Sequence, residues 1–431
     1  MTAVRRRTLL GAALAAPLAA GGCGADDDAL TFFFQARPEE ARVRMRIIEE
    51  FRKRHPGIKV RTIMSGPDPL QQMLTYCAGG KCPDVMMAWE LLYAGLAERG
   101  VLLDLRTLLD RDPAYADELR RDSYPTLYDT FTYGGGQYAL PEQWSGVFLY
   151  YNRRMCAAAG ITPPARWTEA WSFDEFLAAT RELTHRTGDR TGQWGFADAW
   201  VPYFSAACFG MNNGTEWFTP PVNPTRTNLA DPRFAAGFQF YADLAVRHRV
   251  APRVADQQSV SAPDLFRRGR AALAMGGHWL YSEFAGQDDL DIDLTVLPHG
   301  PHGGPGAITD VGCTGLSIAA GSPRVEQAWE FVKFATGPVG QAIVAASGLF
   351  VPVLRSAMAA PGFAAAHRAI ANLEVMTGGP AASRPLPVTP AWGKVSALLE
   401  RGGNRVLRGA ATADSLAGPY TSDIDALLEN R

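Results

Sequence analysis

The chain has 431 residues, of which 47% are hydrophobic and 20% charged, and its formal net charge at pH 7 is −2. This length exceeds what one hydrophobic core comfortably supports, so two or more lobes are expected. The near-neutral charge, without a basic cluster, argues against a nucleic-acid partner.

The first residues have the pattern of an export signal. Residues 1–22 predict a signal peptide, because a basic start precedes an apolar stretch, Leu9 to about Ala20, that is too short to span a bilayer. The run from Arg6 to Leu10 is similar to a twin-arginine signal, and the general secretory route is the alternative.

A lipid attachment site is expected directly after this signal. The run LAAGGC resembles the lipobox of bacterial lipoproteins, although Ala20 stands where leucine is usual. Cys23 is therefore predicted to carry the lipid anchor, with residues 23–28 as anchor and solvated tether. A free cysteine at an ordinary cleavage site is the alternative reading.

Five further cysteines follow, Cys77, Cys82, Cys156, Cys208 and Cys313, and an odd number leaves at least one thiol unpaired. Cys77 and Cys82 flank the short flexible run AGGK, which favours a disulfide between them in an exported protein. Metal binding is the weaker alternative, because the spacing is not CxxC and no second pair follows.

The next elements alternate between strand and helix. Short apolar runs predict strands, and the run PEEARVRMRIIEEFRKRHPG has apolar residues at helical spacing before Pro56 and Gly57 end it. This strand–helix–strand order predicts a parallel, doubly wound α/β lobe. The strands are expected within 29–36, 58–64 and 84–89, and the helices within 38–57, 68–80 and 91–100.

A second region follows the run GGGQYALPEQWSGVFLYYNRRM. Ser172 and Glu175 have capping-box spacing at the start of a predicted helix. Strands are expected in DLTVLP and GCTGLSIAAG, an amphipathic helix in PRVEQAWEFVKFATG, and helices with glycine breaks in the tail 391–431.

Several phrases together resemble one family along the whole chain. PGIKV, GGGQYALPEQWSGVFLYYNRRM, FRRGRAALAMGGHWL and GLSIAAGSPRVEQAWEFVKFATG are similar, in this order, to the extracellular solute-binding proteins of ABC importers. The carbohydrate-binding group, which includes maltose-binding protein, is the most similar. The resemblance implies an α/β fold with two discontinuous lobes, a hinge and a central ligand cleft that closes around the solute.

The resemblance also implies the lobe boundaries. The first lobe is expected to comprise 29–140 with 296–350, and the second 144–292 with 354–431. Crossings are expected near 141–145, 293–299 and 350–354.

A sugar site needs flat aromatic side chains for the C–H faces and carboxylates or amides for the hydroxyl groups. Trp89 and Glu90 follow a predicted strand at its carboxyl end, where ligands bind in open α/β sheets. Trp279 follows two glycines that allow close approach of the backbone. The full predicted set is Gln35, Trp89, Glu90, Glu142, Gln143, Trp144, Ser145, Trp200, Tyr203, Trp279, Asp310 and Trp392.

Structural roles compete with binding at these positions. Trp89, Trp200 and Tyr203 have the alternative of core packing, Glu90 that of a helix cap, and Asp310 that of a solvated loop residue. For Glu142, Gln143, Trp144 and Ser145, placed on the first crossing, we expect contact with the solute. Alanine at Glu142 or Trp144 should then weaken binding and leave the fold intact.

The sequence shows no motif for catalysis. It has no GxSxG elbow, HExxH pair or phosphate-binding glycine loop followed by Lys-Ser/Thr. His299 and His302 have HxxH spacing but no evident third ligand, so no metal and no cofactor are expected. One enzyme alternative is a thiamin-cleaving transferase, since the same fold hosts such enzymes and Cys313 could act as the nucleophile.

The sequence thus predicts a monomeric, non-enzymatic lipoprotein on the outer face of the cell membrane, which binds a sugar and delivers it to an ABC permease. A sensor or adhesion lipoprotein without a permease is the second alternative. A phosphate ester is disfavoured as the solute, because the candidate residues include no arginine.

Overall fold

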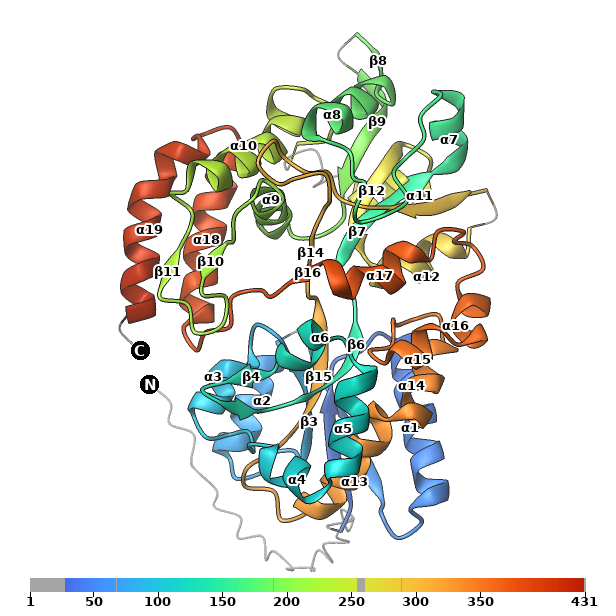
Figure 1. Ribbon diagram of the computed structural model, residues 1–431, viewed down its shortest axis with the longest axis vertical. Helices are drawn as coiled ribbons and strands as arrows, with labels where there is room; N and C mark the ends of the chain where they lie inside the picture. The colour runs from blue at the N-terminus through green and yellow to red at the C-terminus, as the bar shows by residue number, and fades with distance from the viewer. Residues whose placement is uncertain (1–27, 67, 189, 254–259, 288, 430–431) are drawn as a thin grey trace, which may run out of the picture.

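The computed structural model describes residues 28–66, 68–188, 190–253, 260–287 and 289–429, apart from the side chain of residue 416. The predicted signal peptide and Cys23 lie outside these ranges. Two α/β lobes are stacked along the long axis of the molecule, with α17 (Glu374–Ala382) between them (Figure 1). The predicted two-lobed fold is confirmed.

The first lobe is built on a five-stranded sheet in the order β2-β1-β3-β15-β6. Its strands are β1 (Leu30–Phe34), β2 (Val60–Met64), β3 (Val85–Trp89), β6 (Leu140–Trp144) and β15 (Cys313–Ile318). The first three strands are parallel, as their alternation with helices predicts, whereas β15 is antiparallel to both β3 and β6. The sheet is mixed because β15 enters it from the other lobe.

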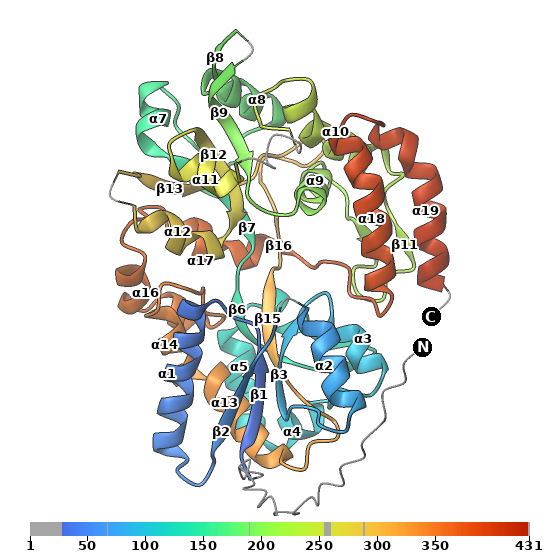
Figure 2. The same cartoon turned by 180° about the vertical axis from the view of Figure 1, so that it is seen from behind.

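Helices surround this sheet (Figure 2). They are α1 (Pro38–Arg54), α2 (Pro69–Ala78), α3 (Tyr93–Glu98), α4 (Arg106–Arg111), α5 (Pro113–Asp122), α6 (Pro125–Asp129), α13 (Val325–Thr336), α14 (Pro338–Ala345), α15 (Arg355–Met358) and α16 (Pro361–Ala366). A small hairpin joins β4 (Thr132–Tyr133) to β5 (Gly136–Gln137). The helix α1 buries Val43, Ile47, Ile48 and Phe51, the stripe that its apolar spacing predicts.

The second lobe has its own sheet in the order β13-β7-β12-β9-β8. Its strands are β7 (Val147–Asn152), β8 (His185–Thr187), β9 (Arg190–Asp198), β12 (Ala271–Gly277) and β13 (Ile292–Thr295). Its helices are α7 (Arg153–Ala158), α8 (Phe173–Glu182), α9 (Pro202–Met211), α10 (Pro232–Val246), α11 (Ala262–Arg267), η2 (His278–Leu280), α12 (Tyr281–Ala285), α18 (Trp392–Leu407) and α19 (Ala413–Glu429), with a short pair of β10 (Phe218–Thr219) and β11 (Arg226–Thr227).

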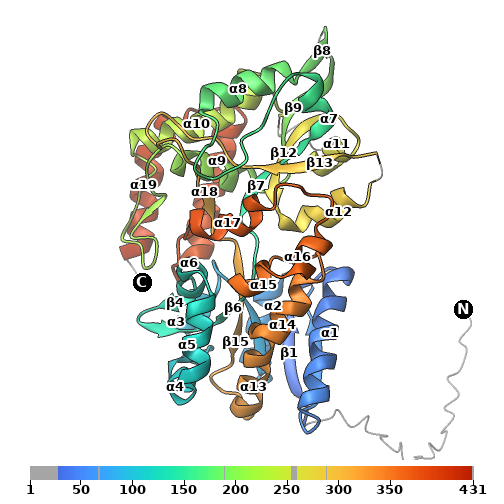
Figure 3. The ribbon, with the colours of Figure 1, turned by 45° about the vertical axis from the view of Figure 1, so that its right-hand side comes forward.

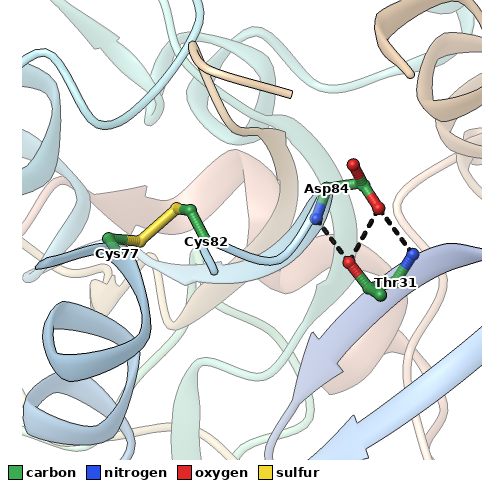
Figure 4. Close-up of a disulfide and its surroundings, with 4 residues drawn as sticks. All are labelled: Thr31, Cys77, Cys82 and Asp84. Carbon is green, nitrogen blue, oxygen red and sulfur yellow. Dashed lines mark hydrogen bonds between the residues drawn. A yellow bond between two sulfur atoms is a disulfide. The ribbon is translucent and has the colours of Figure 1, made fainter. Parts of the chain in front are cut away.

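Two predicted local features are present. Ser172 and Glu175 form the capping box of α8, in which the Glu175 amide donates to Ser172 Oγ and the Ser172 amide to Glu175 Oε2. Cys77 and Cys82, the pair expected from their spacing, are joined by a disulfide between the end of α2 and the start of β3 (Figure 4). Next to it, Asp84 accepts hydrogen bonds from the backbone and hydroxyl of Thr31, both 2.7 Å, which fixes β3 against β1.

The chain first changes lobe close to the expected 141–145, but its other two crossings come later than expected. β6 continues through Pro141 to Trp144, so the first crossing is the short link before β7. The second crossing was expected near 293–299, but β13 pairs with β7, and residues 299–308 hydrogen-bond to the second lobe. The chain crosses instead at β14 (Thr309–Asp310), just before Cys313 starts β15.

The third crossing is also later than 350–354. Val351 and Leu354 bridge to Trp144 and Ser123, and Ser356 binds Asp122, all in the first lobe. The amides of Ala371 and Asn372 donate to Asp293 in the second lobe. From there α17, which lies between the lobes in Figure 3, leads to β16 (Ser383–Arg384). β16 pairs with β14 between the lobes (Figure 1). Tertiary packing thus extends the second-lobe segment beyond its expected end at residue 292, and the first-lobe segment beyond its expected end at residue 350.

Candidate functional site

A cavity of about 380 Å³ lies between the two lobes, a volume in the range of small-ligand sites. Its walls come from α2 and α3 with the turns around them in the first lobe, and from α18, α19 and the segment before α18 in the second. The lining residues are Leu70, Leu74, Leu91, Leu92, Gly95, Glu98 and Arg99 on one side, and Thr389, Pro390, Ala391, Trp392, Gly393, Lys394 and Leu427 on the other.

A row of aromatic rings extends from this cavity along the second lobe. The ring centroids of Trp392 and Phe204 are 5.9 Å apart, those of Phe204 and Trp200 5.1 Å, and those of Trp200 and Trp279 6.4 Å. Trp200 and Trp279 are partly exposed, whereas Trp392 is buried but lines the cavity. The row therefore offers flat apolar surface at the inter-lobe face.

Glycine is required beside Trp279. A Cβ at Gly277 would lie 2.0 Å from the Trp279 ring, so any larger residue would displace the indole. From the sequence we expected another group to approach the backbone closely at these glycines. The group that does so is the Trp279 ring itself.

Trp89 and Glu90 lie at the carboxyl end of β3, and both are partly exposed. They directly precede Leu91 and Leu92 of the cavity wall. Burial of its carboxyl group raises the pKa of Glu90 to about 8, a backbone hydrogen bond opposes this shift, and the charge of Asp310 makes a smaller contribution in the same direction as burial. Glu90 is thus protonated at neutral pH in the free protein and can both donate and accept hydrogen bonds.

The raised pKa of Glu90 predicts a pH-dependent stability. The folded protein keeps the Glu90 proton up to about pH 8, whereas the unfolded chain releases it near pH 4.5, the ordinary pKa of a glutamate. The stabilisation is therefore complete below pH 4.5 and is lost as the pH rises through 8. Glu90→Gln, which is neutral at every pH, should raise the free energy of unfolding relative to wild type by about 2–4 kcal/mol at pH 8.5 and hardly at pH 4.5.

Denaturant unfolding at the two pH values measures this difference. The exposed Glu118 provides the control, and Glu118→Gln should show no such pH-dependent gain. Equal curves for Glu90→Gln and wild type at pH 8.5 would show that Glu90 ionises normally.

Asp310 has a structural role that the sequence did not predict. It is 2% exposed, and its Oδ1 accepts hydrogen bonds from the Val147 amide at 2.9 Å and from Thr309 Oγ1 at 3.2 Å. Burial raises its pKa to about 6, while these hydrogen bonds oppose the shift. The expectation that Asp310 contacts the solute is corrected: in this structure its carboxyl holds the first residue of β7 at the crossing.

Glu142 does not face the cleft either. It is 3% exposed and forms an ion pair with Arg44 of α1 inside the first lobe. Its backbone carbonyl accepts a 2.8 Å hydrogen bond from Gln341 Nε2. Arg44 lies among the buried residues of α1. Its place within an apolar helical stripe could have indicated this ion pair from the sequence, because a buried arginine requires a buried partner.

Two predicted aromatic contacts are also corrected. Trp144 is fully buried and packs against the positions of Gly146 and Gly379, where a Cβ would approach its ring to 2.6 and 2.3 Å. Tyr203 is buried in α9, where it lines a small cavity among α10, α18 and α19. Neither side chain can reach a solute in this conformation, because packing between helices and at the hinge encloses both.

The remaining predicted residues keep some exposure. Gln35 is exposed directly after β1, and Gln143 is the partly exposed residue between Glu142 and Trp144 in β6. Ser145 lies on the crossing, where its Oγ accepts a 2.8 Å hydrogen bond from the His278 amide. Ser145 therefore also links the hinge to η2.

Two inter-lobe contacts were not predicted. Arg37, after β1, forms an ion pair of 2.9 Å with Glu283 of α12, and both side chains are about 40% exposed. His278 Nε2 and His367 Nε2 are 2.7 Å apart in the buried hinge, where burial lowers the pKa of both imidazoles. The sequence feature that could have indicated the Arg37–Glu283 ion pair is the position of Arg37 at a strand end, two residues after Gln35.

Cys313 has the environment of an inert thiol. It is fully buried, and burial raises its pKa well above the usual range, with the Glu90 and Glu142 carboxylates adding to the shift. A thiol held in its neutral form is a poor nucleophile. This argues against the transferase alternative.

Neither a metal centre nor a membrane span stands out in the described ranges. His299 and His302 lie in the segment that packs on the second lobe, and no group of three potential metal ligands occurs among the residues described. Within the same residues, no helix combines the length and apolar character that a bilayer crossing requires.

Two α/β lobes joined by three crossings, with a ligand-sized cavity between them that Trp392 helps to line, define the class of two-lobed solute-binding proteins. The family model described as bacterial extracellular solute-binding protein matches residues 37–342, more than half of the chain. The chain therefore belongs to this family, whose members bind solutes and are not enzymes. Because the family is extracellular, the protein is exported.

Individual relatives agree with this assignment. A lipoprotein in the oleD 5′ region of Streptomyces antibioticus is 28% identical over 89% of this chain and 83% of its own length. The maltotriose-binding protein of Pyrococcus abyssi is 25% identical over 91% of this chain and 78% of its own. The structure of an ABC substrate-binding protein from Listeria monocytogenes in complex with cycloalternan shares the fold, with a TM-score of 0.80, 22% identity and coverage of 94% and 99%.

Proposed function

We propose that this protein binds a neutral sugar or oligosaccharide between its lobes, closes around it, and delivers it to an ABC permease. In this proposal the protein acts as a monomer held at the outer face of the membrane by diacylated Cys23, and performs no covalent chemistry. The relatives named for maltotriose and cycloalternan support a carbohydrate solute.

The observation that carries the proposal is the aromatic row of Trp392, Phe204, Trp200 and Trp279, with Trp89 and Glu90 at the opposing lobe. Flat rings bind the C–H faces of sugars, and a neutral carboxyl can pair with hydroxyl groups in both directions. We propose Trp89, Glu90, Trp200, Trp279 and Trp392 as the principal contacts. Gln35, Gln143 and Ser145 are proposed as further polar partners.

A thermal-shift screen tests this function. Maltotriose, cycloalternan and other neutral oligosaccharides should include at least one that raises the melting temperature, since a ligand that binds only the folded state stabilises it by about 2.7 kcal/mol at 100 times its Kd. The panel should also contain a glycerol phosphodiester, a polyamine and a peptide, because Arg99 and Lys394 line the cavity. A shift by one of these three, with none from any carbohydrate, would refute the sugar proposal.

A further inference from the structure

A second cavity, of about 480 Å³, lies in the second lobe at the amino ends of β9 and β12. Four arginines line it: Arg186, Arg249, Arg253 and Arg270. The two strands run parallel, with Trp194 paired to Ala271 beside this cavity and Asp198 paired to Met275 at the other end. Since Trp200 and Trp279 follow that other end, the arginine cavity is at the opposite pole of the lobe from the inter-lobe site. β8 and β9 mark this pole at the top of Figure 1.

The described part of the cavity wall is positively charged. No described lining residue is acidic, and the nearby carboxylates of Asp243 and Asp264 are paired with Arg247 and Arg267. Residues 254–259, outside the described ranges, contain one acid, Asp256, against four guanidinium groups. A net positive charge therefore remains even if that carboxylate is counted.

Three of the guanidinium groups, those of Arg186, Arg249 and Arg270, also keep donors for a ligand. The side chains of Arg186 and Arg249 form no ion pair or hydrogen bond with the described residues. Arg270 is partly buried and donates only to the carbonyls of Gly192 and Thr191, at 3.4 Å each. These long bonds to neutral acceptors leave the charge of Arg270 uncompensated.

The backbone at Arg249 is a separate observation. Arg249 has φ of 53°, a left-handed conformation that follows the end of α10 and is normally occupied by glycine or asparagine. An arginine there carries a conformational cost, and its side chain lines the cavity.

We propose that this cavity is a second ligand site that binds an oxyanion group of the phosphate type, carried by a small molecule. Guanidinium forks match such oxyanions in geometry and charge. A small ligand is favoured over a flat macromolecular contact because the site is hollow and of ligand size. The partly exposed Trp194 in its wall offers a ring face to the organic part of a phosphate ester. This proposal does not depend on the sugar-binding function.

Calorimetric titration of the full protein with inorganic phosphate, at low ionic strength and pH 7.5, tests the site. Saturable 1:1 binding is expected, and Arg186→Gln and Arg249→Asn should each weaken it at least about tenfold, the equivalent of one lost charge-assisted hydrogen bond. Asparagine tolerates the left-handed backbone, so Arg249→Asn should keep its melting temperature. The control is Arg190→Gln, an exposed arginine of the same pole that does not line the cavity.

A hexose phosphate in place of inorganic phosphate distinguishes a phosphate ester from the free ion. Trp194→Leu should remove any advantage of the ester and leave affinity for inorganic phosphate unchanged. Affinity for a neutral sugar should be the same in Arg249→Asn and wild type, so that this proposal and the sugar proposal fail separately. Absence of saturable phosphate binding, equal loss in Arg190→Gln, or binding only to anionic phospholipid vesicles or acidic peptides would overturn the proposal.

Discussion

Glu142→Ala is expected to lower the free energy of unfolding by about 3–5 kcal/mol, because it leaves the Arg44 charge buried without a partner. The side chains of Arg44 and Glu142 are only 2% and 5% exposed, so water cannot replace the lost carboxylate. Arg44 Nε and Glu142 Oε2 already have no hydrogen-bond partner among the described residues. The variant should therefore show a large fall in melting temperature and denaturant midpoint.

The double variant Arg44→Met with Glu142→Leu provides the control. It removes both charges and keeps the volume, so it should recover most of the lost stability. Folded Glu142→Ala protein should retain its affinity for the solute, since the carboxylate is enclosed in the first lobe. Weaker binding with unchanged stability would restore the sequence-based hypothesis that Glu142 contacts the ligand.

Trp279→Ala is expected to weaken sugar binding about 10- to 100-fold, or roughly 1.4–2.8 kcal/mol, because a partly exposed aromatic ring at the inter-lobe face would be lost. The measurement is a titration with the carbohydrate that gives the largest thermal shift. The cost should fall on binding and little on folding, since the indole is not enclosed in the core.

Trp194→Ala is the matched comparison for Trp279. It removes a partly exposed indole from the same lobe, at the pole away from the cleft. Sugar affinity should remain within about twofold of wild type. If the two alanine variants lost affinity equally, the aromatic row would not be the sugar-binding surface.

Local patterns in the sequence were sufficient for many of the helices and strands, although β8, β9 and β12 of the second lobe were not predicted. Apolar runs with turn residues at their ends define β1, β2 and β3, and the 3.6-residue period of Val43, Ile47 and Phe51 defines the buried face of α1. The serine cap of α8 and the loop between Cys77 and Cys82 are equally local. Each of these features depends on neighbours within a few residues, which a single sequence displays directly.

In strand β6, local sequence patterns do not predict which side chains are buried. Side chains alternate across a strand, so Glu142 and Trp144 share one side and Gln143 has the other. The sequence shows these three residues, but it does not show which side of the strand faces the interior. That choice depends on Arg44, in a helix 98 positions away, and on the glycines that enclose the Trp144 ring.

The positions of the lobe crossings also depend on residues that are distant in the sequence. Residues 299–308 belong with the second lobe because their backbone groups bind Trp171, Asn212 and Trp167, contacts that no local period reveals. The sequence by itself determined many of the elements and the aromatic composition of the site, and its resemblance to a known family gave the two-lobed class. Only the tertiary structure decided which residues face the cleft, because a buried charge or hinge carboxylate is identified by partners that are distant in the chain and adjacent in space.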